Sequence, residues 1–385
     1  MQNCTSPSHF AQSTLPSLLM CMFSFATAFT NFFLPIYFRN TLGFSGAQIG
    51  VLFGAFAATA IMASLPVGLG ADRVTPKWII SALCGILALS SLGMARLKGF
   101  TLYLGIFVLF GVSMNGIRLA LDALYLKVDS GHDTGVRMGL YQGLRMVGIT
   151  LGTASGGYLL DRVDFSGTLM VLSIASLILL FGTLALPNIP AARIGLVEYR
   201  TDFMQPRVLL FIGWLFLFSL HWGAEQTSYA LFLQDTLKLS LWEMGLYMGA
   251  EFITLGLAVW WCGTGFDRGL PLRSMAIGGL LLSGIGHVVM CTPVISVSLL
   301  ARLVHGLGDG AVTIVVYVGM TRLFRLDRMG GNSGLVFLIF SVGSVVGSLI
   351  YGPLGHAYGY AIPLVISGVI TFLITPIVYL LPKSV

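Results

Sequence analysis

Two short stretches of this chain read Gly68-Leu-Gly-Ala-Asp72-Arg73-Val-Thr-Pro76 and Gly263-Thr-Gly-Phe-Asp267-Arg268-Gly-Leu-Pro271. They lie 195 residues apart, and the same offset relates the two halves of the chain along their length without a gap. The recurring positions are mostly glycines and prolines: Gly111, Gly135, Gly139, Gly148, Gly152 and Pro187 correspond to Gly306, Gly330, Gly334, Gly343, Gly347 and Pro382. The chain is therefore a tandem duplication of one folding unit.

The composition is that of a membrane protein. Of the 385 residues, 56% are hydrophobic and 9% are charged, and the mean hydropathy is +0.90, far from the values of soluble domains. Each copy contains six apolar stretches long enough to cross the ~30 Å of hydrocarbon in a bilayer. The predicted spans are 15–38, 48–70, 78–96, 100–124, 137–160, 167–187, 208–233, 242–264, 273–292, 298–321, 331–355 and 361–381.

These spans predict helices, because they are too long and too uniformly apolar for the alternating strands of a membrane barrel. We expect an all-α membrane protein with twelve transmembrane helices in two pseudo-symmetric six-helix bundles. The bundles are residues 1–187 and 207–385, joined by a polar linker at 188–206. Because each copy has an even number of helices, both bundles have the same orientation and are expected to meet at a central cavity.

The charges in the loops predict the orientation of the chain. If the N-terminus is cytoplasmic, thirteen lysines and arginines lie inside and five lie outside, which is the bias found in membrane proteins. We therefore expect both termini in the cytoplasm and the protein in a bacterial inner membrane. The net charge of +6 follows largely from this bias, so no nucleic-acid partner is expected. Ala26-Thr27-Ala28 resembles a signal-peptidase site, but no Lys or Arg precedes it, and we expect a first transmembrane helix there.

The repeated Gly-x-x-x-Asp-Arg turn after the second and eighth spans, in a chain of two six-helix halves, resembles the major facilitator superfamily of transporters. The resemblance covers residues 12 to 382 and implies alternating access between the two halves. It also implies that the turns form a charged latch that holds the outward-facing state, here made by Gly68, Asp72, Arg73, Gly263, Asp267 and Arg268. An alternative is that Arg73 and Arg268 merely follow the positive-inside rule. That alternative leaves the paired aspartates unexplained.

Two further motifs depart from the family patterns that they resemble. Arg302-Leu-Val-His305-Gly306 resembles an Arg-x-x-x-Gly pattern usually found in helix 4, but it lies in the tenth span, and its first-half counterpart is Phe107. The glycines from Gly148 to Gly157 resemble the motif of antiporters in the family, except that Thr153 replaces the expected proline.

Ionisable residues inside the spans are the candidates for function, because such groups are costly in a bilayer and face the protein interior. None of them has a charged counterpart at the 195-residue offset, so the scaffold is duplicated while its chemistry is not. They are Arg118, Asp122, Arg145, His221, Glu225, Glu251, His287, Arg302, His305 and Asp309.

A proton-coupling site is predicted in the second half. Arg302, His305 and Asp309 are spaced i, i+3 and i+7 and share one face of the tenth span. Glu251 lies near the middle of the eighth span. Burial favours a neutral carboxyl group and a nearby arginine favours the charged form, so we expect Glu251 and Asp309 to carry the coupling proton, modulated by Arg302 and His305. This set resembles the lactose-permease-like branch of the family. The alternative is a static ladder of pairs on one helix.

A substrate cavity is predicted from polar and aromatic residues on several spans. Cationic groups in the first half suit an anionic or polyhydroxyl solute; alternatively, Arg118 and Asp122 at i and i+4 neutralise each other. The predicted lining residues are Asn31, Asn115, Arg118, Gln142, Arg145, His221, Trp222, Glu225, Gln226 and Tyr229.

The sequence thus predicts a secondary transporter of a small polar organic solute, driven by proton symport and embedded in lipid as a monomer. Efflux antiport of an amphipathic compound is the alternative, and a non-transporting sensor on the same scaffold is an alternative of another class. An enzyme is not expected, because no nucleophile–base pair stands out. The five cysteines show no CxxC and no metal-ligand spacing, so no metal or other cofactor is expected.

Overall fold

The computed structural model describes residues 7–31, 33–34, 37–38, 41–128, 133–160, 162–189 and 195–380. These residues form helices and no strand. Among them, ten helices are long and apolar enough to cross a membrane, which confirms the predicted all-α membrane fold. Of the two other predicted spans, the first overlaps the shorter apolar helical segment Thr14–Ala28 and lies partly outside the described residues, and the fifth overlaps a helix of 27 residues.

The helices follow the predicted spans. In the first half they are α1 (Pro7–Asn31), α3 (Gly46–Arg73), α4 (Pro76–Arg96), α5 (Phe100–Val128), α6 (Thr134–Leu160) and α7 (Phe165–Thr183). The linker forms α8 (Leu196–Phe203). The seventh span consists of α9 (Pro206–Ala224), the π-helix η1 (Glu225–Tyr229) and α10 (Ala230–Asp235). The remaining elements are α11 (Leu241–Asp267), α12 (Leu272–Val289), α13 (Ile295–Leu323), η2 (Leu326–Arg328), α14 (Met329–Tyr358), α15 (Ala361–Leu373) and η3 (Thr375–Leu380).

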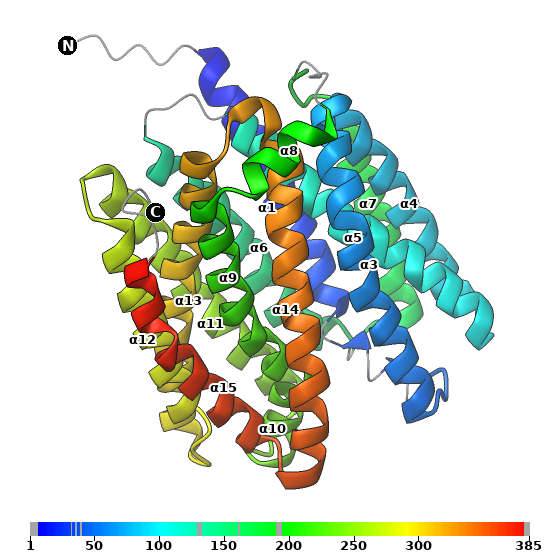
Figure 1. The fold of residues 1–385 in the computed structure, drawn as a ribbon. Helices are drawn as coiled ribbons and strands as arrows, with labels where there is room; N and C mark the ends of the chain where they lie inside the picture. Colours follow the sequence, from blue (N-terminus) through cyan, green and yellow to red (C-terminus); the bar gives the residue numbers. More distant parts are fainter. Residues whose placement is uncertain are drawn as a thin grey trace.

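The two halves lie side by side, and α8 crosses one end of the molecule, which we call the linker end (Figure 1). The most extensive packing between the halves is made by two helix pairs: α6 packs against α11, and α3 packs against α14. The offset of 195 residues carries α6 onto α14 and α3 onto α11. The same helix packing is therefore used twice, as expected for two copies related by a pseudo-two-fold axis.

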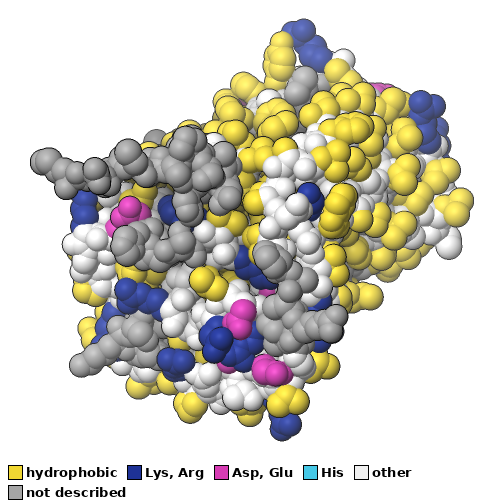
Figure 2. All heavy atoms as spheres, turned by 90° about the horizontal axis from the view of Figure 1, so that it is seen from above, with side chains coloured by type: hydrophobic (Ala, Val, Ile, Leu, Met, Phe, Trp, Pro, Cys, Tyr) yellow, Lys and Arg dark blue, Asp and Glu magenta, His cyan; other side chains and the backbone are white. Residues whose placement is uncertain are grey.

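Charged side chains gather at the linker end, whereas hydrophobic side chains cover the flank of the molecule (Figure 2). Exposed arginines at this end include Arg73, Arg200, Arg268 and Arg325. The positive-inside rule assigns such an end to the cytoplasm. The orientation in a cell stays a prediction.

The equivalent helices α3 and α11 begin with the same local structure. The Ser45 hydroxyl accepts a hydrogen bond from the backbone N–H of Gln48, whose side-chain oxygen accepts one from the Ser45 N–H at 2.9 Å. Ser240 and Glu243 form the same reciprocal pair. Such a capping box satisfies two backbone donors that the helix itself leaves unpaired, which explains why Ser45 and Ser240 recur.

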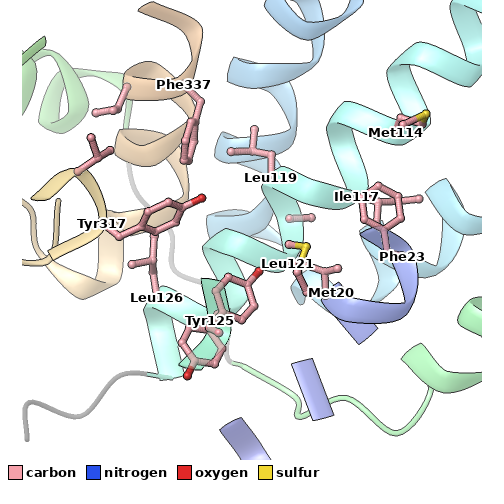
Figure 3. Close-up of a cluster of buried hydrophobic side chains, with 14 of the residues drawn as sticks. Met20, Phe23, Met114, Ile117, Leu119, Leu121, Tyr125, Leu126, Tyr317 and Phe337 are labelled. Carbon is pink, nitrogen blue, oxygen red and sulfur yellow. The ribbon is translucent and has the colours of Figure 1, made fainter. Parts of the chain in front are cut away.

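The interior between the halves is packed around α5. Figure 3 shows Phe23 of α1 beside Ile117 of α5 and Met20 of α1 beside Leu121, with Tyr317 and Phe337 of the second half approaching the same helix. The two halves therefore share one hydrophobic interior at this level.

The glycines at the linker end allow the halves to touch backbone to backbone. A Cβ atom on Gly68 of α3 would lie 2.5 Å from the carbonyl oxygen of Gly330 and 3.0 Å from the Cα atom of Gly334 in α14. The helices α11 and α6 cross with the same backbone contact, in which Gly263 lies against Gly135 and Gly139. At the other end of α3, a Cβ on Gly54 would meet nothing within 4 Å. Small residues at such positions let membrane helices approach closely.

Gly68→Ala is expected to destabilise the protein, because its methyl group would meet the α14 backbone, which cannot rotate out of the way. The cost should be ~1–3 kcal/mol. The matched control, Gly54→Ala on the same helix, should be neutral or slightly stabilising. Thermal unfolding of both variants in detergent checks this, and equal melting temperatures would show that the crossing is not tight.

Candidate functional site

Asp72, at the linker end of α3, binds the start of α14 where these two helices cross. Its carboxylate oxygens accept hydrogen bonds from the backbone N–H groups of Gly330 (2.9 Å) and Gly331 (2.6 Å) at the start of α14. The Lys127 Nζ atom lies 2.7 Å from Oδ1, and the Tyr199 hydroxyl donates to Oδ2 at 2.8 Å. Asp72 is fully buried. It therefore caps a helix of the opposite half, where the helix dipole favours a negative charge.

Asp267 makes the equivalent bonds at the other crossing. Its carboxylate accepts from the backbone N–H groups of Gly135 (2.9 Å) and Val136 (2.6 Å) at the start of α6. Unlike Asp72, Asp267 is exposed. Among the predicted latch residues, the two aspartates and the glycines Gly68 and Gly263 thus form the contact between the halves, whereas Arg73 and Arg268 lie exposed on the linker end.

Sequence analysis did not identify the part played by α8. Besides Tyr199, its residue Asp202 accepts a hydrogen bond from the Asn332 side chain at 2.9 Å and lies 3.2 Å from Nε of Arg328. The second of these contacts is an ion pair to the residue that precedes α14. Burial and the hydrogen bond to Asp72 raise the pKa of Tyr199, so this tyrosine remains a donor. The spacing of Tyr199 and Asp202 on one face of a short helix was the available signal.

Arg302 of α13 is fully buried and joins two carboxylates in the second half. It forms a bidentate pair with Glu225, and its Nη2 atom lies 2.5 Å from Oε2 of Glu251. The guanidinium carbon lies 4.1 Å from the centroid of the Tyr229 ring, a cation–π distance. Two carboxylates from two other spans therefore share one arginine.

His305 and His221 extend this network toward Asp309. The His305 Nδ1 atom lies 2.9 Å from the Ser283 carbonyl oxygen, and its Nε2 lies 3.0 Å from Oε1 of Glu225 and 3.6 Å from Oδ2 of Asp309. The Nε2 atom of His221 lies 3.3 Å from the same Asp309 oxygen. Asp309 also accepts a hydrogen bond from the Ser283 hydroxyl at 2.7 Å. We call Glu225, Glu251, Arg302, His305, Asp309 and His221 the second-half network.

The geometry of the two histidines requires protons in this network. A backbone carbonyl only accepts, so Nδ1 of His305 must carry a hydrogen, and Nδ1 of His221 must do so at the Phe218 carbonyl. Each Nε2 atom then faces a carboxylate oxygen. Without a proton on one of the two atoms, each contact would place two lone pairs against each other. Each contact can therefore hold one proton: the His221–Asp309 contact as a hydrogen bond, and the His305–Glu225 contact as an ion pair, because Nε2 of His305 lies 3.0 Å from Glu225 without the geometry of a hydrogen bond.

His287 lies beside the network. Its ring is T-shaped to that of His305 at 4.8 Å, and neither of its nitrogens has a hydrogen-bond partner in the part of the chain that the structure describes. Ligand atoms of His221, Glu225 and His305 lie within 4.8 Å of one another, a spacing that a cation could bridge. The contacts to Arg302 and Asp309 account for this spacing without an ion.

The structure brings the four predicted proton-coupling residues together, Glu251, Asp309, His305 and Arg302. It also places His221, Glu225 and Tyr229, predicted as cavity lining, in or against the same network. Gln226 is exposed and accepts a hydrogen bond from Ser344 at 3.3 Å, and Trp222 is partly exposed beside Phe340. The side chain of Asn31 lies outside the described residues.

In the first half, Asp122 of α5 is fully buried and bridges the two halves. The hydroxyl groups of Tyr141 and Tyr317 donate to its two oxygens at 2.9 and 2.8 Å. Tyr317 belongs to α13 and is the residue that the 195-residue offset assigns to Asp122. Equivalent positions can touch only near the pseudo-two-fold axis, so this bond lies close to that axis.

Arg118 and Arg145 stand around Asp122. The Arg118 Nε atom lies 3.9 Å from Oδ2 of Asp122, an ion-pair distance that is too long for a hydrogen bond. Arg145 interacts electrostatically with Asp122 and donates to the side-chain oxygen of Gln142 at 3.2 Å. Arg118 also lines a pocket between the halves with Ala60, Ser64, Asn115, Leu119, Phe337 and Ser341.

The two clusters carry opposite excess charge. In the first half, two arginines surround one carboxylate, which leaves one positive charge in excess. The second-half network contains three carboxylates and one arginine, which leaves a negative excess of two when the imidazoles are neutral. Buried charges are stable only when they are compensated. Bound protons would compensate the negative excess of the second-half network, and a bound anion would compensate the positive excess of the first-half cluster.

Comparisons with known proteins agree with this architecture. The sequence model of the Major Facilitator Superfamily matches residues 17–272. No curated protein matches the sequence.

Several solved transporter structures share the fold over 97% of this chain. The outward conformation of FucP, a Major Facilitator Superfamily transporter, has a TM-score of 0.77 at 12% identity, with 99% of that chain covered. The human organic anion transporter MFSD10 has a TM-score of 0.73 at 16% identity, with its whole chain covered. The nucleoside transporter NupG has a TM-score of 0.68 at 15% identity, with 99% covered. At these identities the likeness establishes the fold.

The two latch aspartates should differ in their contribution to stability. Asp72→Asn leaves the buried Lys127 without its carboxylate, which should cost ~3 kcal/mol. Asp267→Asn affects an exposed group and should cost less than ~1 kcal/mol. Thermal unfolding in detergent measures the difference. Equal losses would contradict the unequal burial of the two sites.

Proposed function

Since the chain belongs to the major facilitator superfamily, we propose that it is a proton-coupled symporter that moves a small polar organic solute by alternating access of its two halves. The solute binds between the halves, and the proton binds in the second-half network. The latch aspartates stabilise the state that is closed at the linker end, because both of their helix caps must break before that end can open.

The observation that carries this proposal is the pair of histidine–carboxylate contacts in the second-half network. His305 faces Glu225 at 3.0 Å, and His221 faces Asp309 at 3.3 Å, each with a nitrogen that is free to share a proton with the carboxylate. A change in the distance between Arg302 and its two glutamates would alter how strongly the carboxylates hold that proton. Movement of the halves could thus load and release it.

Glu225 is the point at which protons would enter the network. Its side chain is 10% exposed, whereas those of Glu251 and Asp309 are each 2% exposed. It begins the π-helix η1, an irregularity that often marks functional sites in helices. The proposed coupling set is therefore Glu225 together with the predicted Glu251, Asp309, His305 and Arg302.

Gradient-driven uptake into proteoliposomes tests the proposal. With the membrane potential clamped at zero, a gradient of one pH unit can support about tenfold solute accumulation for one proton moved, because each unit is worth ~1.4 kcal/mol. A panel of labelled carboxylates, sugars and nucleosides supplies the solutes. Glu251→Gln and Asp309→Asn should abolish accumulation while retaining exchange of preloaded solute, because the fixed neutral groups still bind but no longer titrate.

Glu243→Gln provides the matched control, since Glu243 is an exposed capping residue on the same helix as Glu251. It should accumulate solute as the unmodified protein does. Full gradient-driven accumulation by both Glu251→Gln and Asp309→Asn would refute the proton assignment. Solute expulsion driven by an inward proton gradient would replace symport by antiport.

A further inference from the structure

We propose that the pocket beside Arg118 binds the carboxylate group of a monoanionic organic solute whose body is apolar or aromatic. This inference rests on the proposed transport function and names the class of its substrate.

Arg118 is the cation that is available to a ligand. Its side chain is 34% exposed, although it lies well inside the span of α5. In the part of the chain that the structure describes, its guanidinium donates no hydrogen bond. Its contacts are the distant Asp122 and the Phe337 ring, whose centroid lies 5.3 Å from the guanidinium carbon. A guanidinium inside a membrane span calls for an acceptor, and its planar fork matches a carboxylate.

Asp122 does not meet this need. Its oxygens are engaged by the Tyr141 and Tyr317 hydroxyl groups at 2.9 and 2.8 Å. Arg118 and Arg145 both act on this one carboxylate, so one positive charge remains uncompensated. The buried amide nitrogen of Gln142, next to Arg145, also has no hydrogen-bond partner among the described residues. A single negative charge would complete the cluster, whereas a dianion would reverse its sign.

The other polar residues of the pocket argue against a polyhydroxyl solute. The Ser64 hydroxyl donates to the Ala60 carbonyl, and the Ser341 hydroxyl donates to the Phe337 carbonyl. The side-chain amide of Asn115 donates to the Gly111 carbonyl and to the Thr59 hydroxyl. Arg118 is therefore the main donor that the pocket offers. A sugar needs donors and acceptors around its whole ring, but a carboxylate can be bound by the two parallel N–H donors of one guanidinium group.

The pocket has a volume of about 30 Å³, which limits it to the carboxylate group, so the apolar body of the solute would extend from the open side of the pocket along its apolar wall. Leu119 and Ala60 line it beside the ring of Phe337. Ligand sites commonly combine such an apolar wall with a few polar groups that fix the orientation. With the proton of the second-half network, a monoanion would cross the membrane without net charge movement, which fits the opposite excess charges of the two halves.

Ligand-induced thermal stabilisation of the purified protein in detergent tests the inference. The probes are benzoate, phenylacetate and hexanoate at millimolar concentration, each paired with its neutral amide, together with glucose and uridine. The carboxylates should raise the melting temperature saturably, and their amides should not. Arg118→Gln should weaken carboxylate binding roughly ten- to hundredfold, because a charge-assisted hydrogen bond is lost.

Arg118→Lys keeps the charge but loses the fork and should weaken binding less, which preserves the test if Arg118→Gln does not fold. Arg162→Gln, at an exposed arginine outside the pocket, is the matched control. Stabilisation by glucose or uridine alone, or by no carboxylate, would overturn the inference. So would equal carboxylate binding by the unmodified protein and the Arg118 variants. Glu251→Gln should still bind carboxylates, so failure here is distinguishable from failure of proton coupling.

Discussion

Two carboxylates that cap helices of the opposite half hold this structure together at its linker end. Asp72 and Asp267 can accept backbone hydrogen bonds across the interface only because glycines bring the helix backbones into contact there. A side chain at Gly68 or Gly263 would separate the helices and remove the donors from reach. Glycine and aspartate therefore recur together for one reason. The aspartate can reach the backbone N–H groups only where two helices cross closely, and the helices can cross closely only where glycine stands.

The two copies differ in their buried and charged residues. Lys127 and Tyr199 of α8 contact the Asp72 carboxylate, which is buried, whereas Asp267 is exposed. The buried charges diverge further, with a cationic excess in the first half and an anionic excess in the second. In the proposed function, the symmetric scaffold allows the halves to rock about their axis, and the asymmetric charges assign the solute to one half and the proton to the other. Asp122 and Tyr317 mark that axis, because two equivalent positions meet there and form a bond that neither copy could make alone.

The candidate site was only partly predictable. The i, i+3, i+7 spacing identified Arg302, His305 and Asp309 as neighbours, since a helix places such residues on one face. Glu225 was expected to line the substrate cavity, and its pairing with Arg302 and His305 was not predicted. Tyr199 and Asp202 were not singled out, because a short linker between two bundles gives no hydropathy signal. Arg118 and Asp122 were recognised as possible partners, but their separation of 3.9 Å and the two tyrosines on Asp122 could not be foreseen.

The duplication, the positions of the spans, and the glycines and aspartates of the latch could be predicted from the sequence. These are local or periodic properties, so they can be recognised in the linear sequence. Which buried charges meet depends on how the helices pack in three dimensions. Glu225, Glu251 and Arg302 come from three different spans, and their contact depends on the rotation and depth of each helix within the bundle. Hydropathy reports that a helix is buried, but not which of its faces meets which neighbour.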